Sequence, residues 1–236
     1  MKKLLLHIGA PKSGSSTIQS LLGQYLSGRF GIKNKLGETL KYACLQNNER
    51  ILLGPSLLRA QNESVTSYVA STVLPSDPDE ILKWLNNLNK AVEKNDTVIL
   101  SNEGWANISS PSFEKALNQF EVPVEVLFIV RAPVDWMNSG WWQWGAWGDV
   151  SLESWVQSQM PAIDFYSQFE RWSKVDSVER VKVAEISQGL VQTLADFLNL
   201  DPQIFKVEKS VNVGTNFHLL RHLINNKEKY GRKVHT

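Results

Sequence analysis

The sequence predicts an α/β fold: a single domain in which helices flank a parallel β-sheet, with a strand–loop–helix unit near its start. Short apolar runs, typical of buried strands, alternate along the chain with segments whose apolar residues recur at helical spacing. Strands that alternate with helices form parallel sheets covered on both faces. No internal repeat or linker divides the chain, so we expect one domain over residues 1–236.

The predicted strands are short and rich in apolar residues. They cover residues 4–8, 97–100, 124–130 and 181–184. Residues 28–76 are irregular and rich in Asn, Ser and Gly, and no element is predicted there.

The predicted helices are identified by apolar spacing and by their end signals. The first begins at Ser15, because Ile18, Leu21, Leu22 and Leu26 then share one face. Residues 76–78, Ser-Asp-Pro, supply a cap and an early proline for a helix that continues to about residue 94. Further helices are predicted at residues 111–120, 134–144, 152–159, 164–172 and 187–200.

The composition is that of an ordinary globular protein. Hydrophobic residues make up 42% of the 236 residues, charged residues make up 21%, and the formal net charge is +1. This charge predicts no binding to nucleic acid or to a membrane surface, so an anion site must be built locally. The single cysteine, Cys44, excludes an internal disulfide and favours a cytoplasmic location. The apolar run at residues 4–6 is too short for a targeting segment or a membrane span.

The segment Gly9–Thr17 joins the first predicted strand to the first predicted helix. This connection directs free backbone N–H groups and the positive end of the helix dipole towards one point, which favours a phosphate or sulfate. Gly14 permits close approach to the backbone, Lys12 adds a cation, and the loop hydroxyls add donors. A Ser/Gly-rich helix start without a ligand is the alternative interpretation of this loop taken alone.

Two known loop types compare with this segment. Gly9 and Gly14 have the spacing of the nucleotide-binding P-loop, G-x-x-x-x-G-K-[ST], but Ser15 stands where the lysine should be. Residues 11–17 instead resemble the 5′-phosphosulfate loop of the sulfotransferase family, Pro-Lys-[Ser/Ala]-Gly-[Thr/Ser]-[Thr/Ser]. The resemblance implies that the cofactor is 3′-phosphoadenosine 5′-phosphosulfate (PAPS), with PAP as its product, and that Lys12 also acts in catalysis. The residues that would wrap the phosphosulfate are Lys12, Ser13, Gly14, Ser15, Ser16 and Thr17.

A second feature shared with sulfotransferases lies at the strand over residues 124–130. Arg131 ends this strand, and Ser139 follows eight residues later in a helical pattern. The resemblance implies that Arg131 and Ser139 hold the 3′-phosphate of the donor. A guanidinium binds phosphate oxygens bidentately, and a helix-borne hydroxyl adds a donor. For an isolated arginine, pairing with Asp135 would be the simpler interpretation.

Glu103 is the candidate catalytic base. It follows the strand over residues 97–100, and ligands of parallel sheets bind at the carboxyl ends of the strands. Lys12, Glu103 and Arg131 should therefore meet at one edge. Sulfotransferases carry a His or Glu near this position, and a carboxylate can accept the proton of an acceptor hydroxyl. His7 is the rival base, although its place inside a strand is more typical of a hydrogen-bonded core histidine.

Tryptophan is unusually frequent, and four of the nine lie between residues 141 and 147. At helical spacing Trp141 and Trp144 share a face while Trp142 points elsewhere, so the cluster cannot all be buried on one side. We expect Trp141 and Trp144, together with Trp105, to bind the acceptor. Indole faces suit a carbohydrate or another hydroxyl-bearing molecule. Packing within the core is the alternative.

The resemblance covers residues 4–22, 97–105, 125–142 and 181–201, and Asn212 with residues 219–223 looks like the closing region of the family. The chain departs from the pattern at Thr17, where an aromatic residue often stands, and in lacking an evident Arg-Lys-Gly donor loop; residues 231–233 are better interpreted as a basic tail. The expected function is transfer of a sulfuryl group from PAPS to an acceptor hydroxyl without a metal, since the histidines and Cys44 form no ligand set. A P-loop kinase or NTPase and a non-catalytic nucleotide-binding protein of the same fold are the alternatives.

Overall fold

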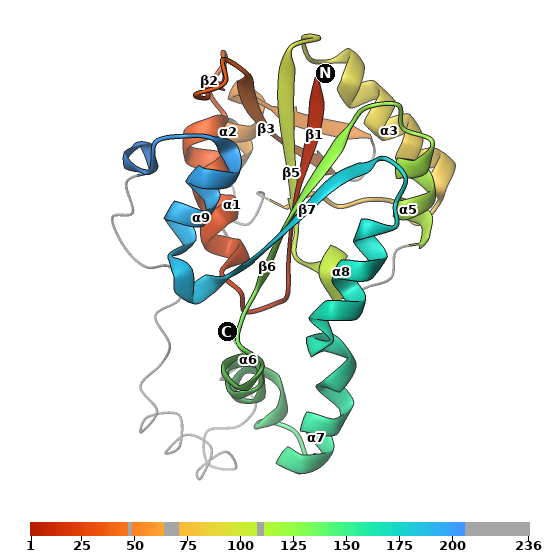
Figure 1. Cartoon of the computed structure of the whole chain (residues 1–236), viewed down its shortest axis with the longest axis vertical. Coiled ribbons are helices and arrows are strands. Elements are labelled where there is room, and N and C mark those ends of the chain that lie inside the picture. The colour runs from red at the N-terminus through yellow and green to blue at the C-terminus, as the bar shows by residue number, and fades with distance from the viewer. Residues whose placement is uncertain (47–48, 64–70, 108–110, 206–236) are drawn as a thin grey trace.

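The computed structural model describes residues 1–46, 49–63, 71–107 and 111–205. These residues form a single α/β domain in which a twisted sheet is flanked by helices on both faces (Figure 1). A helical extension lies beyond one edge of the sheet, below the strands in the view of Figure 1. The predicted fold class is therefore confirmed.

The sheet is mixed but mostly parallel. Its strand order is β2-β3-β5-β1-β6-β7, and β4 pairs with β3. The strands β3, β5, β1, β6 and β7 run parallel to one another, whereas β2 and β4 are antiparallel to β3. The strands are β1 (Lys3–Gly9), β2 (Ile32–Lys33), β3 (Thr39–Gln46), β4 (Arg50–Leu53), β5 (Asp96–Asn102), β6 (Val124–Val130) and β7 (Val178–Glu185).

Helices cover the sheet through two separate apolar cores. On β1, Leu4, Leu6 and Ile8 pack on one face, while Leu5 packs on the other, as the two-residue period of a strand requires. Helices α1, α2 and α9 lie on the Leu5 face, and α3, α5 and α8 lie on the opposite face (Figure 1). The helices are α1 (Ser15–Leu26), α2 (Pro55–Glu63), α3 (Pro78–Lys90), α4 (Gly104–Asn107), α5 (Pro111–Asn118), α6 (Pro133–Gly140), α7 (Leu152–Gln159), α8 (Phe165–Ser173) and α9 (Leu190–Leu198). Shorter turns of helix are η1 (Trp141–Gly145), η2 (Met160–Ile163), η3 (Ile186–Gln188) and η4 (Pro202–Ile204).

The antiparallel pairings of the mixed sheet lie within residues 28–76. This segment contains β2, β3, β4 and α2, for which no element was predicted. Strand β3 pairs in parallel with β5 over Thr39–Tyr42 and in antiparallel with β4 over Ala43–Gln46. Strand β3 is thus a further parallel strand of the sheet, and both antiparallel strands, β2 and β4, pair with it.

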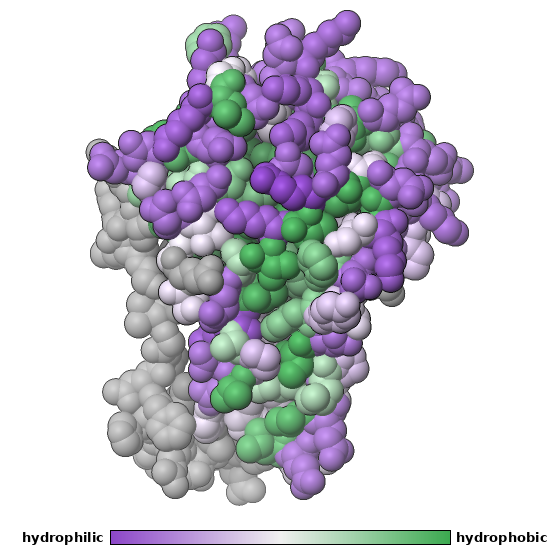
Figure 2. Space-filling view, in the orientation of Figure 1, coloured by the Kyte–Doolittle hydropathy of each residue, from purple (hydrophilic) through white to green (hydrophobic). Residues whose placement is uncertain are grey.

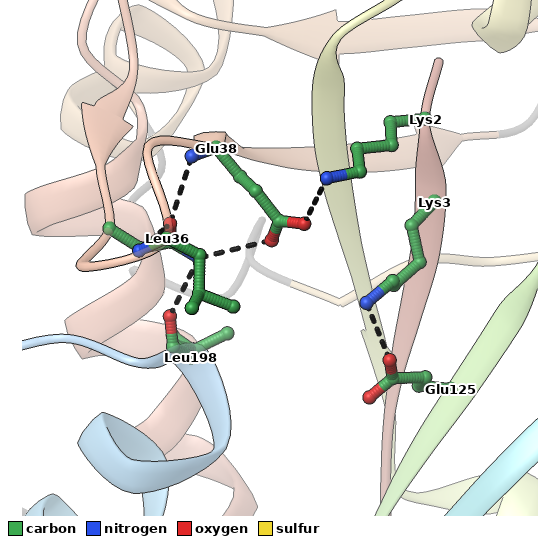
Figure 3. A network of polar contacts seen from close by, with 7 residues as sticks. Lys2, Lys3, Leu36, Glu38, Glu125 and Leu198 are labelled. Carbon is green, nitrogen blue, oxygen red and sulfur yellow. Dashed lines mark hydrogen bonds and ion pairs between the residues drawn. The ribbon is translucent and has the colours of Figure 1, made fainter.

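The amino edge of the sheet is closed by ion pairs (Figure 3). Lys2 pairs with Glu38 at 2.6 Å and Lys3 pairs with Glu125 at 2.5 Å. Glu38 and Glu125 are both buried, and Glu125 also pairs with Arg180. The cations at this edge therefore have carboxylate partners within the protein and are poorly suited to recruit an anionic ligand.

Candidate functional site

The carboxyl edge of the sheet brings together the three charged residues predicted to meet there. Strand β1 lies between β5 and β6, with Ile8 aligned to Asn102 and Gly9 aligned to Ile129. The chain then leads from these strand ends to Lys12, Glu103 and Arg131. The charges of Glu103 and Arg131 both act on the pKa of Lys12, which places each of these two groups within electrostatic reach of Lys12.

The loop after β1 is a tight turn followed directly by α1. The Ser13 N–H donates to the Ala10 carbonyl at 3.1 Å, which closes a β-turn with Pro11 and Lys12 at its centre. Lys12 has a φ of 67° and Gly14 a φ of 81°. Positive φ is costly for a lysine but not for a glycine, so Lys12 is held in a strained conformation. Gly14 also lies against Ile186 and Leu190, where a Cβ would be 3.0 Å from each side chain.

Several buried polar atoms of the loop lack a hydrogen-bond partner among the described residues. They are Ser13 Oγ, Ser15 Oγ and His7 Nε2. A Cβ placed on Gly9 would lie 2.8 Å from Ser15 Oγ and 3.6 Å from His7 Nε2, so both atoms lie close to Gly9. Helix α1 also begins without a side-chain cap, which leaves its first N–H groups open. Unsatisfied donors at a helix start are the groups that bind an oxyanion.

His7 belongs to a buried hydrogen-bond network beneath the loop. Its Nδ1 lies 2.7 Å from Ser101 Oγ, which also accepts a hydrogen bond from Gln19 Nε2 at 3.1 Å. Burial lowers the pKa of His7 to about 3. A group with so low a pKa is a weak proton acceptor, so the interpretation of His7 as a hydrogen-bonded core histidine fits the structure better than a role as base.

Arg131 bonds to the loop and keeps donors to spare. Its Nη1 donates to the Lys12 carbonyl at 3.2 Å. The expected alternative, an ion pair with Asp135, is not found, and within the described part of the chain neither Arg131 nor Lys12 has an ion-pair partner. The half-buried guanidinium therefore retains N–H groups that can bind an anion.

Burial perturbs both Lys12 and Glu103. Burial lowers the pKa of Lys12, the nearby carboxylate of Glu103 opposes this, and the charge of Arg131 adds to the lowering. Burial raises the pKa of Glu103, and the charge of Lys12 opposes the rise. A half-buried carboxylate with a raised pKa beside the cation of Lys12 has the character of a general base.

Glu103 is positioned by a short helix that the core holds in place. It directly precedes α4, and its carbonyl accepts a hydrogen bond from the Ala106 N–H at 3.3 Å. The carbonyl of Trp105 accepts hydrogen bonds from Arg171 Nη2 and Trp172 Nε1, each at 3.2 Å. These contacts attach α4 to α8 and fix where Glu103 lies.

Trp105 does not lie where an acceptor contact would. Its side chain is buried, with its ring 4.8 Å from that of Phe113 between centroids. A ring packed into the apolar core has no free face, so we withdraw the expected acceptor role of Trp105.

The other tryptophans divide into buried and accessible ones. Trp136 and Trp155 are buried and stack on each other, with ring centroids 6.5 Å apart. Trp141 is half-buried against Trp155, whereas Trp144 is 44% exposed and touches Trp136. The expectation that some rings remain accessible is confirmed, and Trp144 is the most exposed of them. In the view of Figure 2, hydrophobic residues lie over the lower part of the molecule, in the region that α7 occupies in Figure 1.

Ser139 and the remaining loop hydroxyls have less defined surroundings. Ser139 is half-buried on α6, one turn after Trp136. Ser16 and Thr17 are half-buried in the first turn of α1. No hydrogen bond connects Ser139 with Arg131 or with the loop in the described residues.

Trp136 contacts the loop but was not among the residues expected to form the site. This residue is 1% exposed, and its indole N–H donates to the carbonyl of Pro11 in the loop. The only sequence signal was its position five residues after Arg131, within a helix that begins at the carboxyl end of a strand.

Some sites are not found in the part of the chain that is described. Residues 1–46, 49–63, 71–107 and 111–205 contain no group of three His, Cys, Asp or Glu residues placed to hold a metal ion. No helix among them is long and apolar enough to cross a membrane. The expectations for Asn212, residues 219–223 and residues 231–233 lie outside the described residues.

Comparisons with known proteins give weak likeness in structure and none in sequence. No protein-family model and no curated protein matches the chain. Among solved structures, a sulfotransferase domain from the curacin biosynthetic pathway is similar with a TM-score of 0.44 and 14% identity, over 93% of this chain and 82% of that one. A gluconokinase from Sinorhizobium meliloti 1021 has a TM-score of 0.38 and 12% identity, over 98% of both chains. A protein of the PezAT toxin–antitoxin system of Streptococcus pneumoniae has a TM-score of 0.37 and 11% identity, over 98% of this chain and 86% of that one.

Proposed function

We propose that this protein is a sulfotransferase that uses PAPS as donor and passes the sulfuryl group to an acceptor hydroxyl. The observation that carries the proposal is the convergence of Lys12, Arg131 and Glu103 at the carboxyl edge of the sheet, beside a loop with unsatisfied donors. Lys12 and Arg131 have no ion-pair partner in the described part of the chain, so both can attract the anionic groups of the donor. The half-buried carboxylate of Glu103 can take up a proton.

The residues present fit the phosphosulfate end of such a donor. The hydroxyls of Ser13 and Ser15 are buried without partners, a state that a bound oxyanion would relieve. Gly9 leaves open the space beside Ser15 Oγ that a Cβ would fill. Lys12 and the first N–H groups of α1 would hold the phosphosulfate, and Arg131 with Ser139 would hold the 3′-phosphate.

Each charged residue then has a distinct task in the transfer. PAPS supplies an activated sulfuryl group and a phosphate leaving group. Lys12 and the loop N–H groups stabilise negative charge that develops on the leaving oxygen. Glu103 accepts the proton of the attacking hydroxyl. Its pKa is raised towards neutral pH, which makes the carboxylate a stronger base. Arg131 holds the donor in orientation through N–H groups that the Lys12 carbonyl does not use.

The acceptor that we propose is a carbohydrate. Trp144 offers an exposed indole face in the extension whose tryptophan cluster also contacts the donor loop through Trp136. Flat aromatic faces bind the apolar side of a sugar ring, while the polar edge of the ring stays available for reaction. Trp141 is half-buried and would form the edge of this surface.

Calorimetry with PAP tests the donor assignment. We expect Arg131→Ala to weaken PAP binding roughly 10- to 100-fold, because loss of one partner of a charged hydrogen bond costs about 1.5–3 kcal/mol. Ser139→Ala should cause a smaller loss. Arg180→Ala is the matched control, since Arg180 lies at the amino edge and pairs with Glu125. Equal PAP affinity in Arg131→Ala and Arg180→Ala would contradict the assignment.

A further inference from the structure

The turn that carries Lys12 exists in one of two forms, and a single peptide decides which. In a β-turn with a hydrogen bond from Ser13 N–H to Ala10 O, types I and II differ by a flip of the peptide between the two central residues. The φ of 67° at Lys12 identifies type II, in which the third residue is usually glycine. Lysine in this place prefers the type I form on its own, so another contact must select type II.

That contact is the indole of Trp136. The orientation of the Pro11 carbonyl is what distinguishes the two forms, and this carbonyl accepts a hydrogen bond from Trp136 Nε1. Trp136 cannot readily follow a flipped carbonyl, because it is 1% exposed and its ring packs against Trp155 and Trp144. Because a trans peptide directs its N–H opposite to its carbonyl, the bond also turns the Lys12 N–H away from Trp136.

Arg131 secures the next carbonyl of the same turn. Its Nη1 donates to Lys12 O, so both carbonyls that flank the strained residue are held by side chains that follow β6. Strained backbone persists where surrounding contacts determine it from more than one side. Trp136 differs from Arg131 in that it is buried in the aromatic cluster and has no charge to offer a ligand.

We propose that Trp136 is a positioning residue, which selects the type II form of the Ala10–Ser13 turn and thereby presents Lys12 and the loop N–H groups to the anion. The loss of its N–H releases the Pro11 peptide and lets the turn relax to the form that lysine prefers. The anion-binding role of the loop rests on the function proposed above, whereas the selection of the turn does not.

Trp136→Phe tests the proposal, because phenylalanine keeps an aromatic ring but has no N–H. Trp155→Phe is the matched control, since it alters the same cluster while no side-chain hydrogen bond joins Trp155 to the loop in the described residues. The nuclear Overhauser effect between Pro11 Hα and the Lys12 N–H is strong in a type II turn and weak in a type I turn, because the flip of the peptide moves the N–H away from Hα. Measured without any ligand, it should weaken by roughly tenfold in Trp136→Phe and stay close to wild type in Trp155→Phe. The affinity for PAP should fall about tenfold in Trp136→Phe, because the loss of one hydrogen bond of typical strength has an effect of this size. The affinity of Trp155→Phe for PAP should equal that of wild type.

The outcomes separate this inference from the proposed function. A weaker Pro11 Hα to Lys12 N–H effect in Trp136→Phe alone supports the selection of the turn. It does so even if wild type fails to bind PAP, a result that would refute only the donor. An effect of equal strength in both variants overturns the inference. Retention of wild-type PAP affinity in Trp136→Phe would show that the turn does not present the loop to the anion.

Discussion

His7 should make the stability of the fold depend on pH below neutrality. Burial holds its pKa at about 3, against an ordinary value of 6.5, so the folded protein keeps His7 neutral where the unfolded chain protonates it. The unfolded chain therefore binds the extra proton between about pH 6.5 and pH 3. Stability from this residue is complete above that window and is lost as the pH falls through it. From pH 7 to pH 4.5 the loss should be about 2–3 kcal/mol.

Urea unfolding of wild type and His7→Asn at pH 7 and pH 4.5 measures this effect. Asparagine keeps a polar side chain within reach of Ser101 but does not titrate. Other groups titrate in both proteins, so the difference between the two pH-dependent losses isolates His7. We expect wild type to lose about 2–3 kcal/mol more than the variant on acidification. If the two proteins lose the same free energy, His7 is not held neutral by burial, and its exclusion as the catalytic base fails with it.

Other predictions concern the site directly. Lys12→Ala should lower the rate of sulfuryl transfer by at least ~100-fold in steady-state assays, because the cation stabilises charge that develops during the reaction. The melting temperature should change little. Turnover at the wild-type rate would contradict a catalytic role for Lys12. Glu103→Gln should bind PAP normally but lower kcat by ~100-fold. In the wild type, the raised pKa of Glu103 moves the acidic limb of the pH–rate profile to higher pH, and the variant should lack this limb. An unchanged acidic limb would assign the catalytic base to another residue. Trp144→Ala should raise the acceptor KM by about tenfold without unfolding the protein, since the ring is 44% exposed; a large loss of stability with an unchanged KM would make it a core residue.

The sequence predicted the elements that depend on local pattern. Strands β1, β5 and β6 were identified from apolar runs within them, as burial on both faces requires. Once these strands were placed, the meeting of Lys12, Glu103 and Arg131 at one edge followed from parallel pairing alone. The helix at α3 was marked by Asp77, whose side chain accepts hydrogen bonds from the N–H groups of Asp79 and Glu80.

Features that depend on distant partners could not be predicted. Strand β3 carries Lys41, which interrupts its apolar pattern and is accommodated only because it pairs with the buried Asp96 at 2.6 Å. The hydrogen bond from Trp136 to Pro11 joins residues 125 positions apart, so no local pattern indicates it. Trp105 was misjudged because a tryptophan next to a candidate base has the same local sequence whether it faces a ligand or the core. In each case the position of the side chain depends on a contact with a residue that is distant in the sequence.

The central claim is that the loop over Gly9–Thr17 binds PAPS rather than ATP or GTP, and the thermal stability of the protein tests it most directly. A ligand that binds only the folded state raises the free energy of unfolding by about 2.7 kcal/mol at a hundredfold excess over its dissociation constant. We predict that PAP raises the melting temperature by several degrees, while ATP and GTP with magnesium have little effect, because Ser15 replaces the lysine that contacts their phosphates. Stabilisation by ATP or GTP with none by PAP would contradict the account and favour a kinase or NTPase.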